Sequence, residues 1–249
     1  MEFSNSSQNL ILKSLSGEDL RLLEPHLHLT ELPLNMNLEP PNTPIESCFF
    51  LTDGIASVVA NGRNGKTIEV GLIGREGVTG SAAILGSTQS PNGTFMQLPG
   101  TGYRIAVSQL KGAMRKSVTL SETLTKFVYS FMIQKSQTAL VNGRGTIDER
   151  LARWLLMAHD RVPSPTFYIT HEFLALMLGV RRPGVTDALN ELEGKGLIRS
   201  RRNQVSILDR KGLEAAAGWS YGLAEAEYQR VFGIGASTGT SGVSRPLGK

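Results

Sequence analysis

Two adjacent arginines, Arg181 and Arg182, stand where a glycine-containing turn leads into a helical pattern. A guanidinium stays charged at any physiological pH, and its fork of N–H donors matches phosphate oxygens and the edge of guanine. Pro183 follows in the first turn of the expected helix, where a missing amide costs little. The arginines would therefore lie at the electropositive end of that helix. This arrangement predicts a recognition helix presented to the major groove of DNA.

The segment of residues 170–208 has the pattern of a winged helix-turn-helix. Thr170 is a good N-cap, and Gly179 stands where a left-handed turn must end the first helix. One apolar face at helical spacing is predicted for that helix, from Phe173, Leu174, Met177 and Leu178. A second is predicted for the following helix, from Val185, Ala188, Leu189 and Leu192. An ordinary helical hairpin with a solvated basic turn is the simpler alternative for these helices alone.

The segment of residues 194–208 adds a basic hairpin to these helices. Two short strands are expected on either side of Arg202-Asn203, and they would form a wing rich in arginine. The order of cap, glycine turn, paired arginines and basic hairpin favours DNA binding over the simpler alternative. Candidate DNA contacts across the helices and the wing are Thr170, Arg181, Arg182, Pro183, Thr186, Asp187, Asn190, Arg199, Arg201 and Arg202.

The distribution of charge agrees with this interpretation. The chain has a net charge of +4, from 26 basic and 22 acidic residues. Residues 1–143 contain 11 of each, and residues 212–249 contain 3 of each, whereas residues 144–211 contain 12 basic and 8 acidic residues. All the excess positive charge therefore falls in the segment with the helix-turn-helix, as a phosphate-binding surface requires.

Composition limits the other classes of protein. No apolar run approaches the roughly 20 residues of a membrane span, and the polar start of the chain is unlike a signal peptide. The single cysteine, Cys48, excludes an intramolecular disulfide and a cysteine-based metal site within one chain. We therefore expect a cytoplasmic protein without cofactor or metal.

The first half of the chain is predicted to form a compact β-barrel or roll after a short helix that Ser16 caps. Asn61-Gly62 and Asn64-Gly65 stand between two of the expected strands and are a strong hairpin signal. The predicted strands cover residues 46–52, 55–60, 67–73, 94–98 and 103–107.

A helical pattern follows from residue 108 to residue 142, with Gly143 as its expected end. It has one broad apolar stripe, which a symmetric partner helix would cover in a homodimer or the chain's own barrel would cover in a monomer. The residues of the stripe that we assign to a dimer interface are Leu120, Leu124, Phe127, Val128 and Phe131.

These patterns predict an α+β protein in four parts. They are an N-terminal helix and β-roll over residues 1–110, a long dimerisation helix over 111–143, the winged helix-turn-helix over 144–211, and a C-terminal helix with a disordered tail over 212–249. Within the third part, a capping box at Thr146 opens a helix, and residues 167–169 form a strand.

Barrel, long helix and winged helix-turn-helix in this order resemble the Crp/Fnr family of bacterial transcription regulators. The resemblance covers about residues 10–211 and is most specific in residues 148–157 and 178–189. It implies a jelly roll like that of cyclic-nucleotide-binding domains, a homodimer, and control of transcription at a roughly palindromic DNA site. RNA polymerase is a further candidate partner. The residues that match the family's base-reading turn and helix are Arg181, Arg182, Pro183, Thr186 and Asp187.

The effector site departs from the family pattern. The acid that holds a ribose hydroxyl in cyclic-nucleotide binders is replaced near Ser81, and the phosphate-binding arginine has no counterpart near Asn92. This departure predicts that cyclic AMP is not the effector, and that the barrel holds either an unknown small molecule or no ligand at all. The candidate pocket residues are Arg75, Glu76, Gly80 and Ser81, although an exposed turn is the simpler reading of the first two.

Motifs that suggest an enzyme are incomplete. His171-Glu172 begins like a zinc-protease helix, but Ala175 stands where the second histidine is needed. Gly65-Lys66-Thr67 ends like a phosphate loop, but Ala60 replaces its first glycine. We therefore expect no enzymatic activity. The remaining alternative is a ligand-binding adaptor or sensor of the same fold that does not recognise specific DNA.

Overall fold

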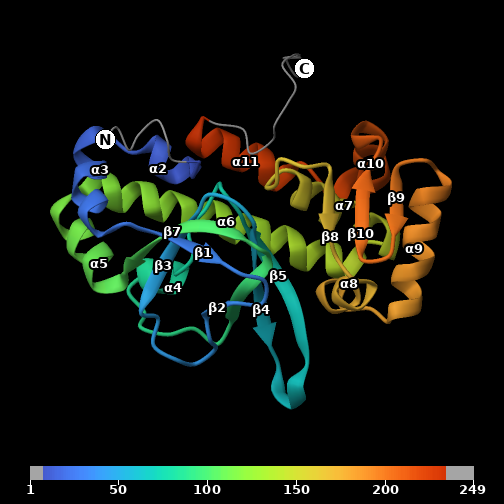
Figure 1. Cartoon of the computed structure of the whole chain (residues 1–249), viewed down its shortest axis with the longest axis horizontal. Helices are drawn as coiled ribbons and strands as arrows, with labels where there is room; N and C mark the ends of the chain where they lie inside the picture. The colour runs from blue at the N-terminus through green and yellow to red at the C-terminus, as the bar shows by residue number, and fades with distance from the viewer. Residues whose placement is uncertain (1–7, 234–249) are drawn as a thin grey trace.

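A computed structural model describes residues 8–233. The predicted disordered tail, apart from Gly233, lies outside these residues. Figure 1 shows a β-roll and a group of small helices and strands side by side along one long helix. The prediction of an α+β protein with an N-terminal β-roll, a long helix and a C-terminal winged helix-turn-helix is confirmed.

The β-roll consists of two antiparallel sheets with the strand orders β1-β7-β3 and β2-β6-β4-β5. Its strands are β1 (His28–Leu32), β2 (Asn37–Glu39), β3 (Ser47–Leu51), β4 (Ile55–Asn61), β5 (Thr67–Ile73), β6 (Gly93–Leu98) and β7 (Gly100–Ala106). The five predicted strands are therefore present, and β1 and β2 add to them. The predicted hairpin joins β4 to β5 through the short helix η2 (Arg63–Gly65), and α4 (Ser81–Ile84) follows β5.

Short helices cover the end of the roll where the described chain begins. They are α2 (Leu10–Ser14), α3 (Gly17–Leu23) and η1 (Glu24–His26). Ser16 caps α3 as predicted, because its side chain accepts a hydrogen bond from the amide of Asp19. The sequence did not predict α2, which depends on a longer-range anchor: the Asn9 amide donates to the carbonyls of Leu51 and Gly77, each at 2.8 Å.

The predicted helix over residues 108–142 is two helices, α5 (Val107–Lys116) and α6 (Val118–Arg144). The break falls at Ser117, whose backbone is extended and whose hydroxyl accepts a hydrogen bond from the amide of Leu120 at 3.1 Å. Asp19 of α3 holds the hydroxyls of Ser117 and Thr119 at the same place. A serine that caps the second helix thus ends the continuous pattern. The long helix also runs past Gly143 and ends at Gly145.

The C-terminal elements form a second group around their own three-stranded sheet, β8-β10-β9. In chain order they are α7 (Ile147–His159), β8 (Thr166–Tyr168), α8 (His171–Leu178), α9 (Arg182–Gly194), β9 (Ile198–Arg201), β10 (Gln204–Ile207), α10 (Arg210–Ala217), η3 (Gly218–Ser220) and α11 (Leu223–Phe232). The predicted capping box of α7 is present, with Thr146 and Glu149 exchanging hydrogen bonds.

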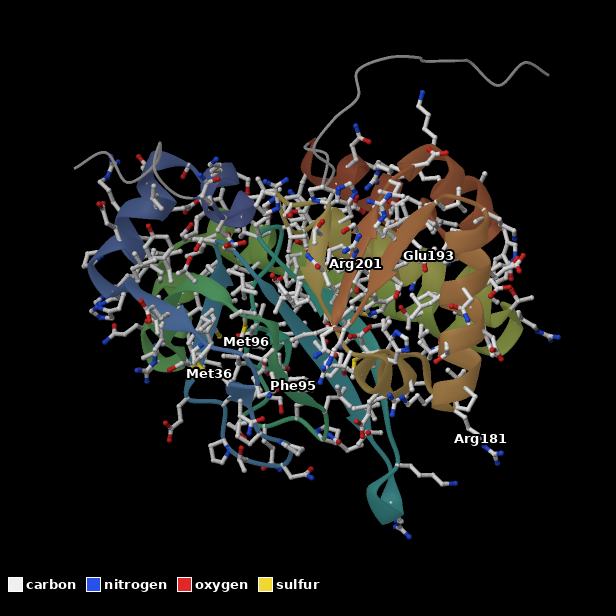
Figure 2. The ribbon with its side chains drawn as sticks, turned by 45° about the vertical axis from the view of Figure 1, so that its right-hand side comes forward. Met36, Phe95, Met96, Arg181, Glu193 and Arg201 are labelled. Atoms are coloured by element: carbon white, nitrogen blue, oxygen red, sulfur yellow. The ribbon has the colours of Figure 1, made fainter. Side chains whose placement is uncertain are left out.

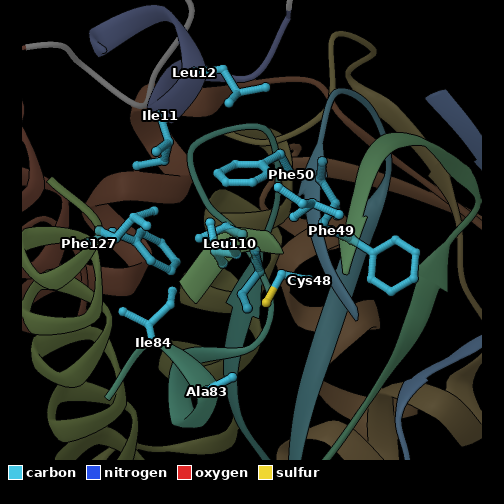
Figure 3. Close-up of a cluster of buried hydrophobic side chains, with 14 of the residues drawn as sticks. Ile11, Leu12, Cys48, Phe49, Phe50, Ala83, Ile84, Leu110 and Phe127 are labelled. Atoms are coloured by element: carbon cyan, nitrogen blue, oxygen red, sulfur yellow. The ribbon is translucent and has the colours of Figure 1, made fainter. Parts of the chain in front are cut away.

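Two cores hold these groups together. The first, called here the N-terminal core, joins the roll to α5 and α6 and includes Ile11, Cys48, Phe50 and Phe127 (Figure 3). The second, called the C-terminal core, contains the buried faces of α7 to α10 and also four residues of the roll, Ile55, Val59, Leu72 and Leu98. The roll and the C-terminal group therefore share one continuous apolar contact.

Residues 218–232, called here the C-terminal bridge, link the two cores a second time. At one end, Tyr221 packs on the C-terminal core and its hydroxyl donates to Asp160 at 2.6 Å. At the other end, Tyr228 is buried in the N-terminal core and its hydroxyl donates to the carbonyl of Glu76 at 2.8 Å. Figure 1 shows α11, in red, running back from the C-terminal group over the long helix α6.

The apolar stripe of α6 faces the roll of the same chain. Leu120, Leu124, Phe127, Val128 and Phe131, which we assigned to a dimer interface, are at most 3% exposed and belong to the N-terminal core. This assignment is wrong in its residues, because the roll already covers the stripe. Within residues 8–233, no helix is long and apolar enough to cross a bilayer.

Candidate nucleic-acid interface

The first helix of the helix-turn-helix begins and ends as its sequence predicts. The Thr170 hydroxyl accepts a hydrogen bond from the amide of Phe173 at 3.1 Å, and Gly179 ends α8 at a φ of 61°. Leu174, Met177 and Leu178 are buried, and Phe173 is half-buried. Gly179 is required by its backbone, since a residue with a Cβ is strained in the left-handed region.

The second helix presents its first turn to solvent. Arg181 is its N-cap residue and Pro183 lies in the first turn, as predicted. Both arginines, Arg181 and Arg182, are exposed, and Figure 2 shows Arg181 extending away from the molecule. No acidic residue stands in this turn, so the partial positive charge of the helix end adds to the two guanidinium groups.

Three of the other candidate residues of α9 differ in exposure and in hydrogen bonding. Asp187 and Asn190 are exposed on the solvent side of the helix. Thr186 is half-buried, and its hydroxyl donates to the carbonyl of Arg182 and lies 3.2 Å from Nδ1 of His171. The hydroxyl of Thr186 is therefore already hydrogen-bonded in the free protein, whereas the polar side chains of Asp187 and Asn190 are exposed to solvent.

The predicted wing is the antiparallel pair of β9 and β10. Its turn consists of Arg202 and Asn203, and Asn203 has a φ of 57°, a conformation that asparagine tolerates better than most residues. Arg199, Arg201 and Arg202 are all exposed. The wing therefore adds three guanidinium groups to the two at the start of α9.

The helix-turn-helix rests on the sheet that contains β4, β5 and β6. The ring of Phe173 packs edge-on against Phe95, with centroids 6.1 Å apart. Deeper in the contact, Nε1 of Trp154 donates to Oε1 of Glu69 at 2.9 Å. Burial raises the pKa of Glu69 to about 7, against the opposing effects of its hydrogen bonds from Ser57 and Trp154.

The predicted effector residues do not form one pocket. Glu76 makes a buried ion pair with Arg161 of the C-terminal group, at 2.7 Å. Burial lowers the pKa of Arg161 and the carboxylates of Glu76 and Asp160 raise it, with a net increase. Arg75 does not line the cavity described next, whereas Gly80 donates its amide to Glu39 at 2.9 Å and Ser81 lines the cavity. The pair at positions 75 and 76 is therefore not an exposed turn, since Glu76 is buried and Arg75 is half-buried.

A cavity of about 220 Å³ lies between the roll and α6. Lys135 of α6 and Glu39 of β2 are the charged residues in its lining, together with polar Ser81, Ser90, Asn92 and Thr94. Burial raises the pKa of Glu39 and lowers that of Lys135. Sequence reasoning missed both residues: Lys135 lies beside the apolar stripe of α6, and no local pattern indicates that β2 faces it.

Comparisons with known proteins identify the C-terminal group. Residues 149–216 match the family model of the Crp-like helix-turn-helix domain. No curated protein sequence matches the chain.

Solved structures of regulators match both halves together. One is described as a transcriptional regulator of the Crp/Fnr family from Eubacterium rectale ATCC 33656, at 19% identity and a TM-score of 0.65, over 83% of this chain and 97% of that one. A Crp/Fnr regulator of Thermus thermophilus matches at 18% identity and a TM-score of 0.62, over 76% and 98%. The c-di-GMP-responsive regulator CLP of Xanthomonas campestris matches at 15% and 0.61, over 77% and 99%.

The fold and the domain match define the class of this protein, a winged helix-turn-helix joined to a β-roll. The chain has a Crp-like helix-turn-helix domain in the fold of Crp/Fnr regulators, and the resemblance seen in its sequence is confirmed.

Proposed function

We propose that this protein is a transcription regulator that binds double-stranded DNA in a sequence-specific manner. The observation that carries the proposal is the pair of exposed arginines at the start of α9, beside a wing with three more. Five guanidinium groups on one unit supply the phosphate contacts on which affinity depends. The proposed contact residues are Thr170, Arg181, Arg182, Pro183, Thr186, Asp187, Asn190, Arg199, Arg201 and Arg202.

The proposed roles of these residues follow from their chemistry. Arg181 and Arg182 can each donate two hydrogen bonds to guanine in the major groove, and Asn190 can pair with adenine. Arg201 and Arg202 in the wing are proposed to contact phosphates, which orient the protein without reading the sequence.

A binding titration with a selected DNA site tests this function and separates it from a non-DNA-binding adaptor of the same fold. The double variant Arg181→Ala/Arg182→Ala should lose about 1–3 kcal/mol for each base-reading arginine. Lys195→Ala is the matched control, because it removes an exposed charge from the opposite end of α9, where Lys195 pairs with Glu191. Unchanged binding by the double variant would refute the assignment of the recognition helix.

We propose that the protein works as a homodimer, through the face of α6 that points away from the roll. Eight residues at the alternating four- and three-residue spacing of a coiled coil are all exposed on that face. Three of them are large and apolar, with Val118 74%, Tyr129 43% and Met132 56% exposed. The eight residues, called here the α6 stripe, are Val118, Glu122, Thr125, Tyr129, Met132, Ser136, Ala139 and Gly143. Small residues at 136, 139 and 143 would allow two helices to approach closely.

We propose that the effector, if the protein has one, is a small molecule other than cyclic AMP. The cavity has one lysine, and a glutamate shares its lining, so a cyclic phosphate would meet a carboxyl group as well as a cation.

The proposed function includes four further points: a roughly palindromic DNA site, contact with RNA polymerase, a cytoplasmic location and the absence of catalysis. The division at residues 110, 143 and 211 also belongs to it, and these three boundaries fall inside α5, α6 and α10.

A further inference from the structure

The turn between β4 and β5 is basic and projects from the roll. The last paired residues of the hairpin are Asn61 and Thr67, and the amide of Gly62 donates to the carbonyl of Lys66 at 2.7 Å. Between them the chain has Arg63 and Lys66, both exposed, and neither aspartate nor glutamate. The turn itself is therefore positively charged and contains no acidic residue.

This turn lies beside the helix-turn-helix. A Cβ added to Gly179 would lie 2.8 Å from Cδ1 of Ile68, so the end of α8 is in direct contact with β5 just behind the turn. On the same sheet, the Ser57 hydroxyl lies 3.8 Å from Sδ of Met177. The sheet and the C-terminal end of α8 are therefore packed together, and this contact brings the base of the turn close to the beginning of α9.

Chain geometry limits the separation of the two basic groups. Lys66 is two residues before Ile68, and Arg181 is two residues after Gly179, and two residues span at most about 7 Å. The Cα atom of Lys66 thus lies within about 7 Å of the Cα atom of Ile68, and the Cα atom of Arg181 lies within about 7 Å of that of Gly179. In Figures 1 and 2 the turn projects on the same side as the beginning of α9, and Figure 2 labels Arg181 there. Both side chains can therefore approach one duplex, whose major groove is about 12 Å wide.

We propose that the β4–β5 turn is a second, sequence-independent DNA contact, in which Arg63 and Lys66 bind phosphates that flank the groove occupied by α9. The inference rests on the proposed function. Cations on a glycine-containing turn, away from a rigid helix, suit phosphate contacts better than base reading. The roll then contributes directly to the affinity for DNA and not only to the folding of the protein.

The dependence of affinity on salt tests this contact. Each neutralised phosphate adds about 0.9 to the slope of log affinity against log salt. The full-length variant Arg63→Ala/Lys66→Ala should therefore have a slope smaller by about 2, so that between 50 and 200 mM salt its affinity falls about 12-fold less than that of the wild type. At low salt it should bind more weakly than the wild type, with an unchanged order of preferred sequences. Charge reversal, Arg63→Glu/Lys66→Glu, should weaken binding further.

The controls separate this inference from the function on which it rests. Lys13→Ala removes an exposed lysine of α2, on the opposite side of the molecule from the turn (Figure 1), and should change neither slope nor affinity. If Arg181→Ala/Arg182→Ala weakens binding but the turn variant matches the wild type, the turn contact is refuted and the proposed function stands. Tighter binding by the turn variant would also refute it, since the turn would then obstruct DNA. If the wild type binds no DNA, both proposals fail.

Discussion

Replacing Glu69 by glutamine should make the protein more stable above neutral pH and leave it unchanged in acid. The carboxyl group lies inside the contact between the roll and the C-terminal group, where it accepts hydrogen bonds from Trp154 at 2.9 Å and Ser57 at 2.6 Å. Burial raises its pKa to about 7. Glutamine has the same shape and can accept from Trp154, donate to Ser57 and let Ser57 donate to Gln97.

The magnitude follows from the difference between the folded and unfolded pKa values. An acid with a raised pKa in the folded state stabilises the fold fully below its unfolded pKa, here 4.5, and this contribution is lost as pH rises to about 7. At 1.36 kcal/mol per pH unit, the loss is about 3 kcal/mol. The free energy of unfolding of the wild type should fall by that amount relative to Glu69→Gln between pH 4.5 and 7, with little further change above.

Urea unfolding at several pH values, followed by tryptophan fluorescence, measures this difference. Every titratable group other than Glu69 is the same in both proteins, so the contribution of these groups cancels when the two proteins are compared at each pH. Glu172→Gln, which changes an exposed carboxylate of α8, is the matched control and should follow the wild type. A gap between wild type and Glu69→Gln that stays constant from pH 5 to pH 8 would contradict the reasoning.

Phe131→Glu should unfold the chain rather than only separate a dimer, because it places a charge in the N-terminal core. The cost should exceed that of a Phe-to-Ala change, about 3–5 kcal/mol, and urea unfolding measures this loss of stability. Met132→Glu, on the α6 stripe, should instead give folded monomers by light scattering with an unchanged circular dichroism spectrum, and a folded dimer would contradict that interface. Titration calorimetry should find no micromolar binding of cyclic AMP or cyclic GMP; such binding together with tighter operator binding would overturn the proposal. Cys48 should react with a thiol reagent only as fast as the protein unfolds, since it is fully buried and burial raises its pKa to about 12; rapid reaction in the native state would contradict its position.

Sequence reasoning succeeded where local chemistry determines the structure. Thr170 and Gly179 could be assigned as the two ends of α8 because a cap and a left-handed turn are properties of single residues. The wing could be predicted from two short strands and a turn at Asn203. Even the break at Ser117 has a local signal, a serine cap, which the continuous apolar stripe of the helix masked.

The sequence could not predict which surfaces meet. An apolar stripe on α6 indicates a covered face, but periodicity does not say whether a roll or a partner helix covers it. Glu76 pairs with Arg161, and Glu69 with Trp154, across 85 residues in each case, and no local pattern links such positions. Lys135 likewise acquires its place in the cavity from the packing of α6 on the roll.

The C-terminal bridge has a consequence for how freely the two halves can be exchanged. Regulators built of separable modules can be recombined by joining one sensing half to another DNA-binding half. Here residues 218–232 belong by chain to the DNA-binding half, yet Tyr228 fills a place in the N-terminal core and bonds to the carbonyl of Glu76. A chimera joined at the end of α6 would bring a foreign bridge to this core or leave the place of Tyr228 vacant. The halves are therefore matched to each other, and changes in one constrain the sequence of the other.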